Sequence, residues 1–223
     1  MTQATARRPG RPRSERARQA ILAATLTLAA EEGPAGLHME AIARRAKVSK
    51  ETLYRWWHSK TELLLDALAE RGQQTIPLPD TGTLHDDLRA FLRATVDSAD
   101  ATTVRLLHHL AAAAASDQTV AHQVRDRFLV TRRAALGQIL HKAVARDEIT
   151  SGYAALAIDL IYGSMWYRLI FYVGPLNYTW ADQVATAIAS HRPATLDDRQ
   201  RPPASADSSR LPSEAPNDPF GAG

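Results

Sequence analysis

The spacing of apolar residues is the feature that most constrains how this chain folds. Apolar residues recur three and four positions apart over long segments rich in Ala, Leu, Glu and Arg, while Gly and Pro concentrate at a few points. This spacing places apolar side chains on one face of an α-helix, whereas a half-buried strand requires strict alternation. No set of alternating strands is visible, so the sequence predicts an all-α protein.

Local start and stop signals predict where the first helices lie. A residue of N-cap type, Ser14, precedes the first periodic segment, and Gly33-Pro34 ends it. Ser49 is suited to cap a later helix, and Ser59-Lys60-Thr61-Glu62 reads as a capping box. The expected helices begin near Ser14, cover about 39–46 and 50–56, and begin again after Ser59.

A connection containing Pro77, Pro79 and Gly82 separates this first group of helices from a second. Further helices are expected from Thr83 and over 102–115, 118–146, 151–173 and 180–191. Half of the twelve prolines lie in 193–223, where large apolar residues are scarce, so this tail is expected to be disordered. The predicted parts are a flexible basic arm at 1–13, a helical domain at 14–72, a larger helical domain at 83–192, and the tail at 193–223.

Charge is distributed unevenly along these parts. The formal net charge is only +3, yet residues 1–72 hold 13 Lys and Arg against 8 Asp and Glu. Residues 73–192 hold 11 of each kind, and residues 193–223 hold 3 basic against 5 acidic residues. An excess of positive charge confined to one part predicts a polyanionic partner for that part.

Several function classes have no support in the sequence. The chain has no cysteine, which excludes thiol nucleophiles, disulfides and Cys-ligated metal and fits a reducing compartment. His108 and His109 with His122 are poor candidates for a metal site, because adjacent helical residues point about 100° apart. Hydrolase, metalloprotease and nucleotide-binding motifs are missing as well. We therefore expect no enzymatic activity, no metal and no cofactor.

The expected location is the cytoplasm. The N-terminus carries arginines without an apolar core stretch, which does not fit a secretory signal. The longest apolar stretch, from Leu160 to Leu176, is interrupted by Arg168 and preceded by Asp159, and is shorter than an uninterrupted membrane span. A buried helix is the better interpretation of this stretch.

The segment from Leu37 to Leu64 predicts a helix-turn-helix. Ile42, Ala46, Val48 and Leu53 are spaced to bury between two short helices joined by a turn at Lys47-Val48. The second helix begins with polar residues, and in such motifs this end enters the major groove and contacts base edges. Donors such as Lys50 and Arg55 fit guanine acceptors or phosphates, and Thr52 fits a hydrogen bond or a thymine methyl group.

This segment resembles the DNA-binding domain of the tetracycline-repressor (TetR) family of regulators over about residues 14–70. The matching positions are Ala30-Glu31-Glu32-Gly33, Ile42-Ala43, Ala46, Val48-Ser49, Thr52-Leu53-Tyr54, Trp57, Lys60 and Leu63. The resemblance implies that Tyr54 and Lys60 contact phosphates, that Lys50, Glu51 and Arg55 face the groove, and that Trp56 touches the backbone. With Arg11, Arg13, Ser49 and Thr52, these residues form the expected DNA-binding set.

Two positions depart from the family pattern. His38 stands where a capping Thr or Ser is usual, and Lys47 stands where Gly is common, which implies strain if the backbone requires a positive φ.

The N-terminal arm carries a second DNA-binding signal. The arm from Arg7 to Arg13 contains Gly-Arg-Pro and resembles an AT-hook, whose arginines lie in a narrow minor groove. A tail that only aids solubility is the alternative.

The second domain is expected to bind an effector and to dimerise, as the resemblance implies. The pocket candidates are Arg105, His108, His109, Tyr162, Trp166, Tyr167 and Phe171, although an aromatic stripe of this kind also fits a helical core. Dimerisation through the last two helices would use Ala154, Ala157, Ile161, Val184, Ala185 and Ile188, residues that equally fit packing within one subunit.

The function predicted from these features is a dimeric DNA-binding transcriptional regulator, a repressor released from a palindromic operator by a small-molecule effector. One alternative keeps DNA binding without a ligand, as in an architectural or constitutive regulator. A second alternative is an α-helical carrier or enzyme whose basic N-terminus is incidental.

Overall fold

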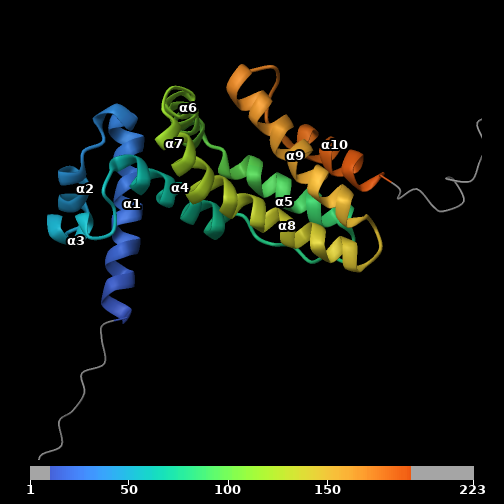
Figure 1. Ribbon diagram of the computed structural model, residues 1–223, viewed down its shortest axis with the longest axis horizontal. Helices are drawn as coiled ribbons and strands as arrows, with labels where there is room; N and C mark the ends of the chain where they lie inside the picture. Colours follow the sequence, from blue (N-terminus) through green and yellow to red (C-terminus); the bar gives the residue numbers. More distant parts are fainter. Residues whose placement is uncertain (1–10, 192–223) are drawn as a thin grey trace, which may run out of the picture. The chain divides into compact units, whose positions relative to one another are not determined.

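The structure is a computed structural model that describes residues 11–191, with side chains described from Ser14 onward. Within this range the chain is helical and contains no strand, which confirms the all-α prediction (Figure 1). The elements are α1 (Arg11–Gly36), α2 (Met39–Arg45), α3 (Lys50–Tyr54), α4 (Lys60–Thr75), α5 (Leu84–Ser98), α6 (Ala101–Ser116), α7 (Gln118–Gln123), the π-helical segment η1 (Val124–Leu129), α8 (Val130–Ala145), α9 (Ser151–Phe171) and α10 (Tyr178–Ala189).

Helix α1 begins three residues earlier than the expected start at Ser14. Pro12 falls in its first turn, where the fixed φ of proline and its missing N–H are tolerated. At Gly33 the backbone leaves the helical region, with φ 73° and ψ 173°, so the long helix is interrupted where the sequence predicts its end. The rest of the predicted basic arm, residues 1–10, and the predicted tail at 193–223 lie outside the described residues.

The first helices share a core that holds α2 and α3 against α1 and α4. Leu28, Ile42, Leu53, Trp57 and Leu63 are buried in it. The apolar face of α1 and the capped start of α4 meet here, since α1 packs on α4 and α2 packs on both α1 and α3. The helix-turn-helix is therefore supported from behind by two longer helices.

Helix α4 joins the two groups of helices. Its residues pack on α1 and also on α5, η1 and α8, as Figure 1 shows for the teal helix. Ser59 caps it as predicted, accepting a hydrogen bond from the Glu62 amide at 3.1 Å. The Glu62 carboxylate accepts from the His58 amide at 3.0 Å and thereby satisfies a donor one residue earlier than the standard capping box.

The expected helix 118–146 is present as three consecutive helical elements, α7, η1 and α8. The π-helical turn η1 lies in the middle and packs on α4 and α8. A π-turn inserts extra residues into a helix, and such turns are frequent at functional sites. Apolar periodicity does not reveal this insertion, because the segment remains helical on both sides of it.

The last two helices cover α5 and α8. Helix α10 packs on α5 and α9 packs on α8. Asp182 on α10 accepts hydrogen bonds from Arg89 and Arg93 of α5, at 3.2 and 2.8 Å. These ion pairs and the buried apolar faces fix α10 against the rest of the chain.

The prediction that the apolar stretch around α9 is a buried helix holds for one face only. The opposite face exposes four large apolar residues, Leu156, Leu160, Tyr167 and Phe171. Within the described part of the chain, α9 is the one helix whose length and composition would allow a membrane crossing, which is weak evidence because core helices pass the same test. Asp159 of the same helix pairs with Arg133 of α8 at 2.7 Å.

Candidate nucleic-acid interface and internal cavity

The turn between α2 and α3 places a lysine in a backbone conformation that glycine adopts most readily. Lys47 adopts φ 57°, and the amide of Val48 donates to the carbonyl of Ala43 at 3.0 Å. A left-handed conformation places the side chain of a non-glycine residue close to its own carbonyl oxygen. The positive φ on which the predicted strain depends is therefore present at Lys47.

Helix α3 is fixed by its cap and by one buried side chain. The Ser49 hydroxyl accepts from the amide of Thr52 at 3.2 Å, as the sequence predicts, and lies 3.1 Å from the Thr52 hydroxyl. Leu53 is fully buried beneath the helix. At the start of α2, His38 makes no side-chain hydrogen bond to the helix, which confirms the weaker cap expected there.

The outward face of α3 is polar and accessible. Lys50 is 61% exposed, Glu51, Tyr54 and Arg55 are also exposed, and so is Lys60 at the start of α4. The hydrogen bond from Ser49 lowers the pKa of Glu51, so this carboxylate remains an ionised acceptor. The face thus offers cationic donors suited to guanine or phosphate and one anionic acceptor suited to cytosine.

The two tryptophans after α3 connect this face to the core. Trp57 is buried and donates from Nε1 to the Asp66 carboxylate on α4 at 2.8 Å. Trp56 is half-buried, packs edge-on against Trp57 with ring centroids 5.6 Å apart, and has the Arg55 guanidinium 5.8 Å from its ring. The expected DNA-contacting residues from Ser49 to Lys60 thus lie on α3 and on its connection to the start of α4, whereas the side chains of Arg11 and Arg13 lie outside the described ones.

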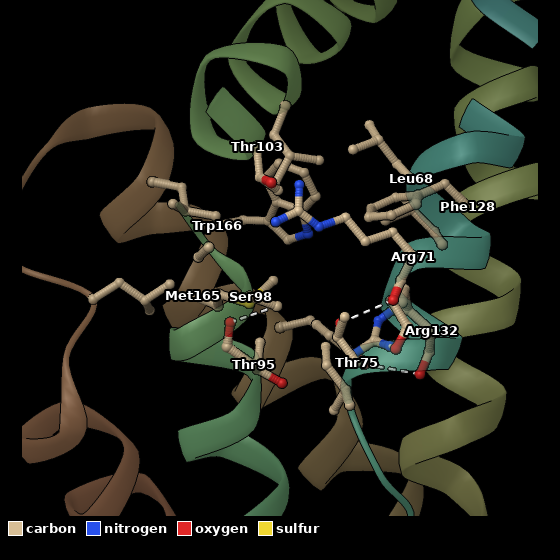
Figure 2. A pocket seen from close by; sticks show the side chains of 18 residues that line it. Leu68, Arg71, Thr75, Thr95, Ser98, Thr103, Phe128, Arg132, Met165 and Trp166 are labelled. Atoms are coloured by element: carbon tan, nitrogen blue, oxygen red, sulfur yellow. Dashed lines mark hydrogen bonds between the residues drawn. The ribbon is translucent and has the colours of Figure 1, made fainter. Parts of the chain in front are cut away.

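A cavity of about 60 Å³ lies where α4, α5, α6, η1, α8 and α9 meet (Figure 2). Most of its wall is apolar, including Leu68, Phe128, Met165 and Trp166. Hydroxyl groups of Thr75, Thr95, Ser98 and Thr103 interrupt the apolar wall. No acidic residue is among the described residues that line it.

Two arginines reach this cavity from different helices. Arg71 of α4 is partly exposed and pairs with Asp100 at 2.6 Å. Arg132 of α8 is only 7% exposed, and its Nη1 donates to the Gly72 carbonyl at 3.3 Å. Its Nη2 and the Thr103 hydroxyl are buried without a hydrogen-bond partner. Burial lowers the pKa of Arg132, although a guanidinium in a protein keeps its charge.

Two of the seven expected pocket residues line this cavity, Tyr162 and Trp166. Tyr162 donates its hydroxyl to the Arg132 carbonyl at 2.8 Å, and burial raises the pKa of this tyrosine. Both residues lie on the buried face of α9, which explains why they meet the cavity.

The structure places the other five expected residues elsewhere. Arg105 and His109 are exposed on α6, because each lies about 100° around the helix from a buried neighbour. His108 contacts the Leu169 carbonyl and the Tyr172 hydroxyl. Tyr167 and Phe171 are 58% and 68% exposed on the outer face of α9.

Sequence reasoning missed Arg71, Thr103, Phe128 and Arg132. Arg132 and the adjacent Arg133 both have apolar residues three and four positions away, yet only Arg132 is buried. No sequence signal distinguishes them, because the distinction depends on which side of α8 faces α4.

The expected dimer-forming residues also lie differently from the prediction. Ala157, Ile161, Ala185 and Ile188 are buried within the chain, and Ala154 and Val184 are half-buried. Four of the six are thereby used for packing inside one subunit, because α9 and α10 turn these faces toward α8 and α5. The face of α9 that remains free carries Leu156, Leu160, Tyr167 and Phe171 around Gly163, where an added Cβ would meet no atom within 4 Å.

A helix-turn-helix with an exposed cationic face, attached to a helical domain with a cavity, defines the class of DNA-binding regulators. Two family models match the chain: "Bacterial regulatory proteins, tetR family" over residues 21–67 and "Tetracyclin repressor-like, C-terminal domain" over residues 78–188. The chain belongs to the TetR family of transcriptional regulators, as the resemblance predicted.

Individual relatives agree with this assignment. The HTH-type transcriptional regulator YdeS of Bacillus subtilis is 34% identical, over 72% of this chain and 82% of its own length. The crystal structure of the TetR family regulator SCO0332 is 31% identical with a TM-score of 0.71, covering 78% of this chain and 96% of that one. BioQ, solved with its double-stranded DNA operator, shares the fold at 18% identity and a TM-score of 0.55, covering 78% and 98%.

Proposed function

We propose that this regulator is a dimeric repressor in the cytoplasm that leaves its operator when a small molecule occupies the internal cavity. The observation that supports this most directly is that α4 extends from the DNA-contacting residues to the cavity. The helix starts at Lys60, beside the polar face of α3, and its last turns supply Leu68, Arg71, Gly72 and Thr75 to the cavity wall. A ligand that displaces these residues acts on the same helix that supports the DNA-contacting segment.

In this proposal Lys50, Glu51 and Arg55 face the major groove and contact base edges, and Tyr54 and Lys60 bind phosphates. Ser49, Thr52 and Trp56 make the remaining contacts with DNA. Sequence preference then comes from α3, since base-edge contacts specify a sequence and phosphate contacts only position the protein. Arg11 and Arg13 lie in α1 rather than in an extended arm, so they are assigned to DNA contact from the start of this helix and not to an AT-hook.

We infer that the second copy packs on the outer face of α9. Exposed apolar residues in a continuous row are unusual on a monomer and mark contact surfaces. Leu156, Leu160, Tyr167 and Phe171 form such a row, and Gly163 in its middle allows close helix approach. A two-fold dimer is needed because two recognition helices must meet half-sites roughly 34 Å apart on a palindromic operator.

Release of the operator requires that the effector bind the two forms of the dimer with different affinity. The small cavity favours this, because a ligand of many atoms displaces its walls, including the end of α4. The small volume also keeps one alternative in view, a regulator that binds DNA without any ligand.

A binding titration with the DNA upstream of the protein's own gene tests the proposal. We expect binding that depends on the DNA sequence and weakens steeply as the salt concentration rises. Its stoichiometry should be that of a dimer. A protein that binds this DNA and unrelated DNA equally would contradict the repressor function. Operator binding that no cavity-occupying compound changes would instead support the ligand-independent alternative.

A further inference from the structure

The cavity contains a buried positive charge without a counter-ion. No Asp or Glu of the described residues pairs with Arg132, although the other buried charged side chain, Asp87, is paired with Arg146. Arg132 interacts with the Gly72 carbonyl, the Tyr162 side chain and the Phe91 ring, whose centre lies 5.5 Å from Cζ, and none of these groups is an anion. Tyr162 beside it remains a neutral phenol, because burial raises its pKa.

A buried unpaired charge is unfavourable to the free protein. Desolvation of a guanidinium is compensated in folded proteins by an anion with good geometry, and here the chain supplies none within its described part. Nη2 is buried without a partner, and the Thr103 hydroxyl on the α6 wall is a second unpartnered polar atom. Figure 2 shows both side chains among those lining the cavity, with Arg71 extending toward Thr103.

We propose that the cavity binds an organic carboxylate with an apolar body, its oxyanion head paired with the guanidinium of Arg132. This inference rests on the proposed function, because it names the chemical class of the effector. Arginine presents several N–H donors in a fixed plane, which matches a carboxylate in two parallel hydrogen bonds. The Thr103 hydroxyl offers one further hydrogen bond to a polar group of the ligand.

The apolar part of such a ligand would lie against the apolar side chains of the cavity wall. Phe128, Leu129, Met165 and Trp166 line the cavity. Trp166 and Leu129 also line a neighbouring apolar hollow of about 230 Å³. A shift of these two side chains joins this hollow to the cavity, so an elongated ligand is accommodated without unfolding a helix.

The test uses the full-length protein without DNA and two matched probe pairs, decanoate with 1-decanol and 4-phenylbutyrate with 4-phenylbutanol. Binding is followed by calorimetry and by tryptophan fluorescence, since Trp166 forms part of the wall. We expect each carboxylate to bind about 10- to 100-fold more tightly than its alcohol, as befits a hydrogen bond to a charged group. Equal affinities within the pairs, or no binding of any probe at millimolar concentration, would overturn the inference.

Two variants at adjacent positions locate the head group. Arg132→Met keeps an unbranched, flexible side chain and removes the guanidinium charge, and is expected to abolish the preference for carboxylates. Its melting temperature without ligand is expected to equal or exceed that of the wild type, because an unpaired buried charge is gone. A purely structural Arg132 would instead lower the melting temperature and leave the carboxylate preference unchanged.

Arg133→Met is the matched control, because Arg133 is exposed and pairs with Asp159 outside the cavity. It should retain the full preference for carboxylates. Should Arg132→Met fail to fold, the wild-type comparison of acid and alcohol still decides whether an anion is preferred, and Thr103→Val reports on the second contact. Operator binding measured on the same preparations separates a failed ligand class from a failed repressor function.

Discussion

Arg127 of the π-turn and Asp66 of α4 form an ion pair of 3.2 Å between Nη1 and Oδ2. The same carboxylate oxygen accepts the 2.8 Å hydrogen bond from Nε1 of Trp57, which lies three residues after the end of α3. Arg127 also lies 3.6 Å from Glu62. Its neighbours Phe128 and Leu129 line the cavity, so one short chain of contacts runs from the cavity wall to the end of the helix-turn-helix.

This chain of contacts predicts that Asp66→Asn weakens the response to ligand more than it weakens DNA binding. The amide keeps an acceptor for Trp57 and loses the ion pair to Arg127. We expect the operator affinity to change by less than about threefold, while the ligand-induced loss of affinity shrinks by roughly 2- to 30-fold, equivalent to about 0.5–2 kcal/mol of coupling. Titrations with and without ligand measure both quantities.

Arg125→Gln serves as the control for the Asp66 experiment, because Arg125 belongs to the same π-turn and pairs only with its exposed neighbour Asp126 among the described residues. Its ligand response should match the wild type. An unchanged response in Asp66→Asn would show that coupling passes through other contacts of α4.

Phosphate and base contacts are expected to separate in a salt series. Lys60→Ala should weaken binding to all sequences alike and reduce the slope of log K against log salt by about one, since one phosphate contact is lost. Lys50→Ala or Arg55→Ala should in addition change the base preference by about 1–3 kcal/mol at one position of each half-site. A selection on randomised operators measures this, and identical preferences in all three variants would contradict the assigned roles.

The turn at Lys47 predicts a stabilising substitution. Lys47→Gly removes the left-handed strain at φ 57° and is expected to raise the free energy of unfolding by roughly 0.5–1 kcal/mol, with a melting temperature about 2–4 °C higher. Arg44→Gly is the comparison, because Arg44 lies inside α2 and should lose about that amount. A lower melting temperature for Lys47→Gly would refute the strain.

The exposed row on α9 predicts a monomeric variant. Leu160→Arg places a charge in the middle of the proposed dimer face and should shift the protein from dimer to monomer in sedimentation experiments, with loss of operator affinity. Val130→Arg is the control, since Val130 is equally an exposed apolar residue but lies on α8. A dimeric Leu160→Arg protein would exclude this face as the interface.

A buried charge cluster predicts where the chain is most sensitive to mutation. Asp87 is fully buried, accepts from the amide and hydroxyl of Thr81 at 2.6 and 2.8 Å, and pairs with Arg146 at 3.2 Å. Asp87→Ala leaves these donors without a partner and should lower the free energy of unfolding by about 3–5 kcal/mol. Asp80→Ala, at an exposed ion pair with Lys142, should leave the midpoint of denaturant unfolding close to that of the wild type.

Helix boundaries and the DNA-contacting segment follow from signals that act over a few residues. Ser49, Ser59 and Thr83 each cap the helix that the sequence predicts, because a hydroxyl reaches the free amides of the next turn whatever surrounds it. Gly33 interrupts α1 for an equally local reason. The start of α1 was misjudged because proline is compatible with a first turn, and the π-turn was missed because it preserves helical periodicity.

The sequence by itself therefore determined the helical class, the helix-turn-helix and the polar face of α3, since propensity, caps and short-range spacing act within one or two turns. Only the tertiary structure decided which face of α9 is covered, and that Arg132 rather than Arg133 is enclosed in a cavity. These outcomes depend on which faces of α8 and α9 are turned toward α4 and α5. Residues with similar sequence neighbours, such as Arg132 and Arg133, are therefore buried in one case and exposed in the other.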